Sequence, residues 1–212
     1  MNLKKRLDET IHDVFIEEFY SGKYRAGEKV DPAELAAQFS ISRTPVVLAL
    51  KRLANEGILT VSSGGKYYIP IPTRKMLDEV CEVRCLLEQH AVSIHVKNND
   101  AAVGLKLKML AEQSKEAFLS GDPVTSVKCD FDFHRSFIEL TGNSCLMEAH
   151  VSVLNRFVGI KYSLGNQLES QERAVDRHME IMEFILANDE KKAKESVWNH
   201  IESARQRIAK CI

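Results

Sequence analysis

The sequence predicts a mainly α-helical protein of two domains. The first is a winged helix-turn-helix of three helices and a β-ribbon wing, and the second is an all-α antiparallel bundle of six helices. Apolar residues recur at helical spacing through most of the 212 residues. Two short β-rich runs, ILTVS and KYYIP, flank the turn residues Ser63-Gly64-Gly65. Because Pro70 and Pro72 form a stiff pair typical of a linker, we place the domains at residues 1–72 and 73–212.

Composition excludes several classes of protein. A hydrophobic content of 44% is that of a globular chain able to bury one or two cores, unlike a disordered or fibrous sequence. The five cysteines form no CxxC pair, and their odd number argues against a secreted disulfide framework. The N-terminus is charged and helically periodic, and no segment reaches the roughly 18 apolar residues of a membrane span. We therefore expect a soluble protein of the reducing cytoplasm.

Apolar spacing and capping residues predict the first two helices. The first helix ends near Ser21-Gly22, and its apolar positions are Leu3, Leu7, Ile11, Val14, Phe15 and Phe19. The run Asp31-Pro32-Ala33-Glu34 then places an N-cap, a first-turn proline and a capping-box glutamate in order. A short second helix therefore begins there and extends to about Phe39.

The third helix combines a polar first turn with an apolar remainder. Ser42 is placed to cap it, Pro45 lies in its first turn, and Gly57 can end it in the left-handed conformation. Most of its length is expected to face the domain core through Val47, Leu48, Leu50 and Leu53. The β-ribbon that follows completes the winged helix-turn-helix.

The start of this third helix is suited to contact DNA. Its free N–H groups and positive dipole favour a phosphate, and an arginine there can bind a guanine edge in the major groove. A wing with two glycines at its tip can approach the DNA backbone closely. The residues that we expect to contact DNA are Ser42, Arg43, Thr44, Lys51, Arg52, Gly65 and Lys66.

Overall charge does not decide between DNA and other partners. The formal net charge is -1, and residues 1–72 carry ten Lys/Arg against nine Asp/Glu. Between Ile41 and Lys66, however, four basic residues stand against the single Glu56, which gives a local balance of +3. Two alternatives remain open: an ordinary solvated surface, and a winged helix used for protein contacts.

The pattern after residue 72 is helical throughout. Short connections between the six helices favour an antiparallel bundle over a sheet. The helices are expected to begin at Thr73, Asn99 or Asp100, Asp122-Pro123, Asn143, Glu169 and Asp189. Single side chains without a recognisable cluster are expected on the surface or in packing roles, namely His90, His95 and His150, and Trp198 is expected in the core.

Four side chains of the bundle are candidate metal ligands. Asp130 and His134 are four residues apart, so they share one face of a helix. His178 and His200 lie ten and eleven residues from the turn between the last two helices, so an antiparallel pair brings them to nearly the same height. One carboxylate and three imidazoles suit Zn, our first choice, or Ni, Mn or Fe(II) better than Ca or Mg. Histidines satisfied within the bundle are the alternative.

The sequence resembles the GntR family of bacterial transcription regulators. The run SGKYRAGEKVDPAELAAQFSISRTPVVLALKRLANEGILTVSSGGKYYIP is similar to the DNA-binding head of that family, and the remainder resembles its FadR-type, or FCD, effector domain. The most specific element is SRTPV followed by ALKRLANEGIL. The resemblance implies a homodimer that binds a short palindromic operator. After SRTPV the family usually carries Arg-Glu, of which the arginine contacts DNA, whereas this sequence has Val47-Leu48.

The same resemblance implies residues for the metal and the effector. Metal-bearing FCD domains have an aspartate and a histidine in a DxxxH pattern and two later histidines, which match Asp130, His134, His178 and His200. The segment EVRCLLE resembles the family's RxxLE, whose arginine can point toward the effector cavity, so the resemblance implies that Arg84 binds the effector. An i,i+4 pair of Arg84 with Glu88 is the alternative.

Together these features predict a ligand-responsive transcription regulator. A small organic acid would bind the metal through its carboxylate and change the spacing of the two recognition helices in the dimer. Two other classes remain open. A metal-dependent hydrolase or isomerase could use the aspartate and histidines to activate water, although an enzyme has no evident need for the winged head. A purely structural metal could instead stabilise the bundle.

Overall fold

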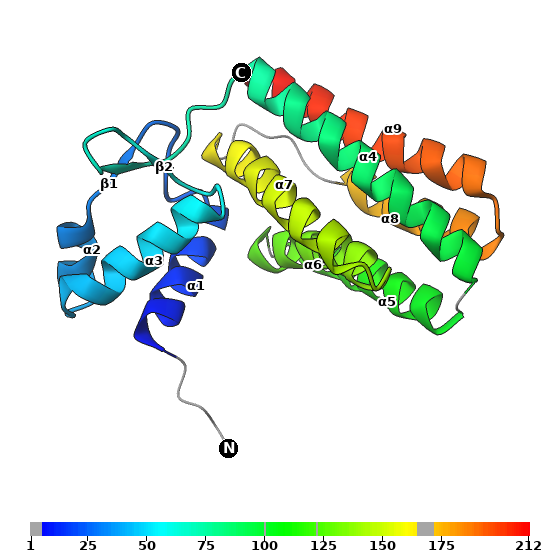
Figure 1. Cartoon of the computed structure of the whole chain (residues 1–212), viewed down its shortest axis with the longest axis horizontal. Coiled ribbons are helices and arrows are strands. Elements are labelled where there is room, and N and C mark those ends of the chain that lie inside the picture. Colours follow the sequence, from blue (N-terminus) through cyan, green and yellow to red (C-terminus); the bar gives the residue numbers. More distant parts are fainter. Residues whose placement is uncertain (1–5, 100, 122, 165–171) are drawn as a thin grey trace. The chain divides into compact units, whose positions relative to one another are not determined.

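The computed structural model describes residues 6–99, 101–121, 123–164 and 172–212. Within these ranges the protein has nine helices and three short strands, and the predicted mainly α-helical fold is confirmed (Figure 1). The described residues form two compact units, one from those within 6–73 and 155–164 and the other from those within 74–154 and 172–212. None of the helices in the described ranges is long and apolar enough to cross a bilayer.

The first two helices form where spacing and caps predicted them, and the predicted helical position Leu3 lies outside the described residues. Helix α1 (Leu7–Tyr20) buries Phe15 and Phe19 almost completely. Helix α2 (Pro32–Gln38) begins with its proline in the first turn, and the Asp31 carboxylate accepts a hydrogen bond from the Ala33 N–H at 2.8 Å. The cap therefore satisfies a backbone donor that the helix itself leaves unpaired.

Helix α3 (Arg43–Asn55) packs against α1 and α2 through one apolar face. The residues on that face are buried: Val46, Ala49, Leu50 and Leu53. The prediction that Leu48 faces the core is wrong, because this side chain is 45% exposed, and Val47 is only half-buried. Each residue turns the helix by roughly 100°, which carries residue 48 away from the buried face.

Three short strands complete the first unit. Strands β1 (Lys29–Val30), β2 (Thr60–Val61) and β3 (Tyr67–Tyr68) form an antiparallel sheet in the order β1-β3-β2. Strands β2 and β3 are the predicted ribbon, and its turn uses Gly65, whose φ is 70°. Strand β1 was not predicted, because two residues are too few to produce a periodic pattern.

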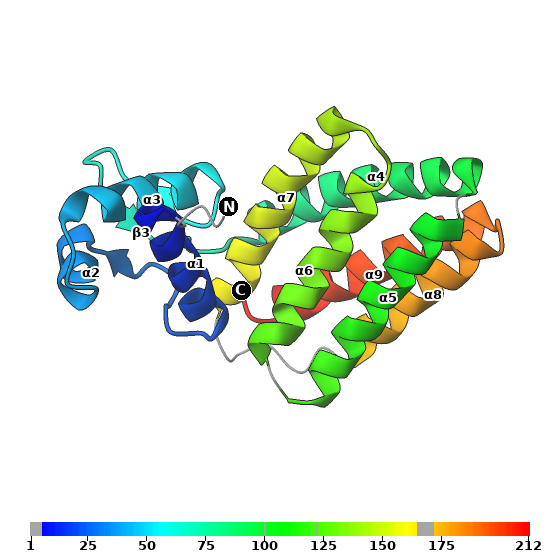
Figure 2. The same cartoon turned by 90° about the horizontal axis from the view of Figure 1, so that it is seen from below.

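Six helices after residue 73 confirm the predicted all-helical second part of the fold. Helix α9 contacts both α4 and α8, and α5 contacts α6 and α8 (Figure 2). Asp189 caps α9 by accepting a hydrogen bond from the Lys192 N–H at 3.1 Å. The predicted starts at Asp100, Asp122 and Glu169 lie outside the described residues. The helices are α4 (Arg74–Asn98), α5 (Ala101–Leu119), α6 (Pro123–Glu139), α7 (Ser144–Ser163), α8 (Glu172–Leu186) and α9 (Glu190–Ala209).

Helix α7 contributes residues to both units, and the part from residue 155 onward belongs to the first. Within that first unit, the Tyr162 ring lies 5.0 Å from the Tyr20 ring and 6.4 Å from the Phe19 ring, measured between centroids. The Ser163 carbonyl accepts a hydrogen bond from the Ala26 N–H at 3.0 Å. The end of α7 is therefore part of the core around α1. The domain boundary placed after residue 72 stays a prediction.

Candidate functional site

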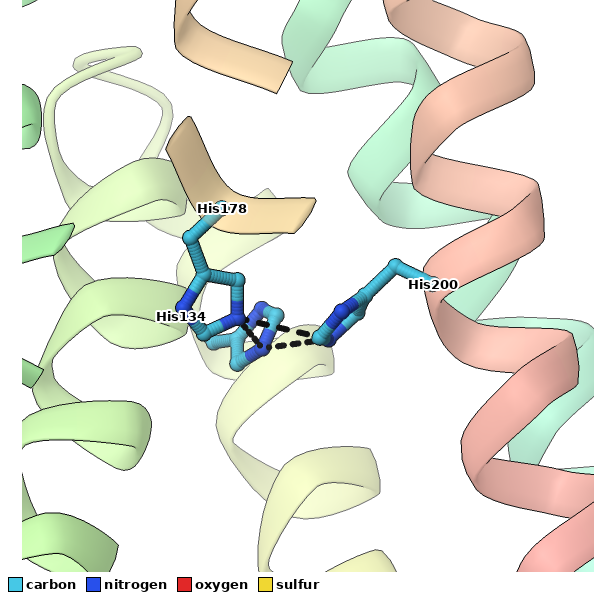
Figure 3. Close-up of side chains that lie close together, drawn as sticks. All are labelled: His134, His178 and His200. Atoms are coloured by element: carbon cyan, nitrogen blue, oxygen red, sulfur yellow. Dashed lines mark hydrogen bonds between the residues drawn. The ribbon is translucent and has the colours of Figure 1, made fainter. Parts of the chain in front are cut away.

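Three buried histidines from three helices meet inside the second unit. His134 comes from α6, His178 from α8 and His200 from α9, and their rings turn toward one another (Figure 3). The Nε2 atoms of His134 and His178 are 3.1 Å apart, those of His134 and His200 are 3.1 Å apart, and those of His178 and His200 are 3.4 Å apart. His178 and His200, predicted to lie at nearly the same height along two antiparallel helices, are thus in direct contact.

A cation between these rings explains the triangle better than hydrogen bonding does. One imidazole nitrogen either donates a proton or offers a lone pair, so three nitrogens in mutual contact cannot form three good hydrogen bonds. A point equidistant from three nitrogens at these separations lies about 1.9 Å from each, close to the roughly 2.0–2.1 Å of a Zn–N bond. The three histidines could therefore hold a transition-metal ion.

The protonation state of the cluster favours metal binding. Burial and, to a smaller extent, the neighbouring His134 together lower the pKa of His178 to about 3. Burial likewise lowers the pKa of His134 and of His200, and Arg84 adds to the effect on both. The rings are consequently neutral near pH 7, and neutral imidazole is the form that binds metal ions.

Asp130 stands at the edge of this cluster. Its Oδ1 atom is 3.6 Å from His178 Nε2 and 4.0 Å from His134 Nε2, and its side chain is 19% exposed. These distances bring all four predicted ligands to one place, although the three nitrogens are closer to one another than Asp130 is to any of them. Its role as a fourth ligand stays a prediction.

A buried carboxylate on α4 holds His134 in place. The sequence analysis did not identify it as a residue that orients a metal ligand. Glu88 of α4 is 1% exposed, and its oxygens lie 3.1 Å from His134 Nδ1, 3.1 Å from His150 Nε2 and 2.6 Å from Arg84 Nε. Burial alone would raise the pKa of Glu88, but the nearby Arg84 and His134 hold it well below its usual range. An ionised carboxylate only accepts hydrogen bonds, so the Nδ1–H of His134 donates and its Nε2 lone pair points into the cluster.

The other predicted residues of this unit divide between confirmed and corrected expectations. Arg84 forms the i,i+4 pair with Glu88 that was the alternative to effector binding, and effector binding by Arg84 stays a prediction. His95 is a buried packing residue and His90 is exposed, as expected. His150 was expected to belong to no cluster, and this is wrong because its Nε2 lies 3.1 Å from the Glu88 carboxylate. Trp198 was expected in the core, and this is wrong because the indole is 50% exposed. Helix α9 buries the face that carries Ala193, Val197 and Ile201, and Trp198 lies outside that face.

The residues predicted to contact DNA lie on the surface of the first unit. Ser42, Arg43 and Thr44 are exposed around the start of α3, and Gly65 and Lys66 are exposed at the tip of the wing. Ser42 occupies the N-cap position, but its side chain does not make the predicted capping bond to any described residue.

The two basic residues in the second half of α3 differ in their surroundings. Lys51 is exposed. Arg52 is also exposed, but its Nε donates to Glu56 at 2.8 Å, and Glu56 also contacts His12 Nε2 at 2.7 Å. Part of the local positive charge is therefore neutralised at Arg52, whereas no ion pair of Lys51 is found within the described residues.

Comparison with known proteins assigns the family. The family model described as "Bacterial regulatory proteins, gntR family" matches residues 7–69, and the one described as "FCD domain" matches residues 79–203, more than half of the chain. The chain belongs to the GntR family. This regulator is similar over most of its length to other transcriptional regulators, and the comparisons indicate a regulator and not an enzyme.

Individual relatives of the regulator support the same family. It is 27% identical over 190 residues to the Nta operon transcriptional regulator of Aminobacter aminovorans, and the alignment covers 89% of this chain and 88% of the relative. It is 25% identical over 193 residues to the gluconate operon transcriptional repressor of Bacillus subtilis, covering 89% and 79%. Among solved structures, E. coli McbR/YncC has the same fold, with a TM-score of 0.81, 18% identity and coverage of 98% and 99%.

Proposed function

We propose that the regulator binds a palindromic operator as a homodimer and that a divalent transition metal in its FCD domain helps to bind a small organic-acid effector. The observation that carries this proposal is the convergence of three neutral, buried histidine nitrogens inside the effector domain of a GntR regulator. Burying polar imidazole nitrogens without good hydrogen-bond partners destabilises a protein, so the presence of such a cluster favours a role in ligand binding.

The DNA contacts are assigned to α3 and the wing. Arg43 at the exposed start of α3 would bind a base edge or a phosphate, with Ser42 and Thr44 beside it. Lys51, Arg52, Gly65 and Lys66 would contact the DNA backbone. Two copies related by a twofold axis would bind two half-sites, so a palindrome is the operator symmetry expected for a homodimer.

The metal would be held by His134, His178 and His200, with Asp130 as a fourth ligand. Three imidazoles and a carboxylate suit zinc best and also accept nickel, manganese or iron. When bound, the metal would supply positive charge that attracts a ligand carboxylate, and an ion that takes more than four ligands would accept that carboxylate beside the four side chains. The chain's own contribution is to orient His134 through Glu88 and to place the positive charge of Arg84 close enough to affect the pKa values of the histidines.

An organic acid is the effector class that this site favours. A carboxylate is attracted by a metal ion and by the guanidinium of Arg84, and we assign Arg84 to effector binding on that ground. The gluconate operon repressor of Bacillus subtilis, a relative of this regulator, is named for an operon of a carboxylate-bearing sugar acid. Sugar acids are therefore the first compounds to test.

Helix α7 offers a route from the effector site to the head. His150 near its start contacts Glu88, which contacts the candidate ligand His134, and residues of α7 beyond 155 belong to the unit that contains α3. An effector that binds two arrangements of α7 unequally would shift the equilibrium between them.

The first experiment tests DNA binding. Purified regulator is incubated with fragmented source genome at about 50 and 200 mM salt, a range over which phosphate contacts weaken steeply. We expect one or a few palindromic sites to be retained at both salt concentrations. Retention that is independent of sequence and vanishes at the higher salt concentration would contradict a specific operator.

The second experiment tests the effector site. Sugar acids are titrated calorimetrically into zinc-loaded and chelated protein, with His178→Ala as the matched variant. Saturable binding without turnover, present only in the zinc-loaded wild type, is expected. If the chelated protein and the His178→Ala variant bound the sugar acid as tightly as the zinc-loaded wild type does, the result would contradict a metal-assisted effector site.

A further inference from the structure

Helix α3 exposes an apolar side chain in the middle of its outer face. Leu48 is 45% exposed and the adjacent Val47 is half-buried, although both were expected in the core. Thr44 and Lys51, one turn before and one turn after Leu48, are exposed on the same face. Leu48 therefore lies between polar and basic side chains rather than within an apolar surface.

The charged side chains of α3 itself are all basic. Helix α3, whose sequence is RTPVVLALKRLAN, contains no acidic residue. The acidic residue that follows it, Glu56, is engaged by Arg52 and His12. A single exposed leucine needs no explanation by itself. This one sits between Arg43 and Lys51, where a polyanion would be attracted and where the outer face of a recognition helix meets base edges.

The major groove offers one apolar feature to such a side chain. Of the four bases only thymine carries a methyl group there, whereas guanine, cytosine and adenine present hydrogen-bond donors and acceptors. Leu48 and Val47 have no side-chain donor or acceptor, so they cannot form the bidentate contacts that identify guanine or adenine. Burial of a thymine methyl against a leucine removes apolar surface of both partners from water.

We propose that Leu48, with Val47 beside it, is a specificity-determining residue that contacts thymine methyl groups, so that each operator half-site carries a thymine opposite the middle of α3. This inference rests on the proposed binding of DNA by α3. It assigns base preference at these positions to methyl contacts, while Arg43 and Lys51 supply affinity through phosphates or a separate base edge.

The test replaces single thymines of the selected operator by deoxyuracil, which removes only the methyl group and keeps every hydrogen-bonding atom. Affinity is measured for the wild type and for Leu48→Ala. At one or two positions of each half-site, we expect uracil to weaken wild-type binding about fourfold, the factor for one lost buried methyl group. Leu48→Ala should weaken binding to the thymine operator. Replacing thymine by uracil at those positions should then reduce the affinity of the Leu48→Ala variant only slightly further.

Leu7→Ala is the matched control, because Leu7 is 49% exposed on α1 and undergoes the same truncation away from α3. This control should bind both operators as the wild type does. Equal wild-type affinity for thymine and uracil at every position would overturn the inference and leave operator binding intact. The inference would also be overturned if Leu48→Ala kept the full sensitivity to uracil. Failure to retain any specific DNA would overturn the proposed function and the inference with it.

Discussion

Replacing Glu88 by glutamine should reduce both the stability of the FCD domain and its affinity for metal. The carboxylate receives hydrogen bonds from three donors, Arg84 Nε, His134 Nδ1 and His150 Nε2, and it is 1% exposed. A glutamine keeps the shape but offers one acceptor oxygen, and its NH2 group faces donors. The variant also leaves the buried Arg84 guanidinium without its opposite charge.

The magnitude follows from these contacts. Breaking a buried ion pair by removing one partner destabilises a protein by about 3–5 kcal/mol, because a buried charge remains uncompensated. Loss of the group that orients a metal-binding histidine typically weakens metal affinity about 10–100-fold. Glu88→Gln should therefore lower the free energy of unfolding of the metal-free protein and, separately, weaken zinc binding within that range.

Two measurements separate the effects. Urea unfolding of the chelated protein reports stability without metal, and competition titration with a chromophoric chelator reports zinc affinity of the folded protein. Glu82→Gln is the matched control, because Glu82 is exposed on the same helix and no hydrogen bond of its side chain to a described residue is found. A change in unfolding free energy below about 1 kcal/mol, together with zinc affinity equal to that of the control, would refute the assignment of Glu88.

Three further predictions address the ligands, the DNA contact and the head. His178→Ala should weaken zinc affinity by more than about 100-fold, beyond the loss typical of an orienting group, whereas exposed His90→Ala should not change it; chelator competition measures both. Arg43→Ala should weaken operator binding about tenfold or more per half-site by fluorescence anisotropy, since a lost guanine or phosphate contact costs roughly 1–3 kcal/mol; unchanged affinity would exclude Arg43 from the interface. Burial lowers the pKa of His12, but hydrogen bonds to Glu56 and Asp13 prevail and raise the pKa above 6.5. The stabilisation of the head is therefore complete below pH 6.5 and is lost as pH rises through the raised pKa, so the urea midpoint should fall over that range in the wild type and change less in His12→Gln.

Local signals in the sequence predicted the elements that short-range chemistry determines. The cap at Asp31 and the cap at Asp189 depend on residues two or three positions away, so they are visible in the sequence and confirmed in the structure. The height of His178 and His200 followed from counting residues to a turn, because antiparallel helices rise by the same amount per residue.

Features that depend on distant partners were missed or wrong. Glu88 meets its partners His134 and His150 across 46 and 62 residues, and no local pattern reports such a contact. Leu48 and Trp198 were placed in the core because they are apolar, but a helix buries only one face, and the residues opposite these two already fill it. Assigning residues to the core by hydrophobicity, without their angle around the helix axis, therefore overestimated the number of core residues.

The positions of Glu88 and Arg84 have a consequence for how an effector could act. Arg84 is held by Glu88, and the same carboxylate holds His134 and, on α7, His150. A carboxylate effector that attracted Arg84 would compete with Glu88 for the guanidinium. Weaker binding of Arg84 would leave Glu88 to its two histidines, and one of these belongs to the helix whose last turns pack on α1. Such competition requires no large movement, because one buried carboxylate serves all three donors and a change at one donor alters the other two.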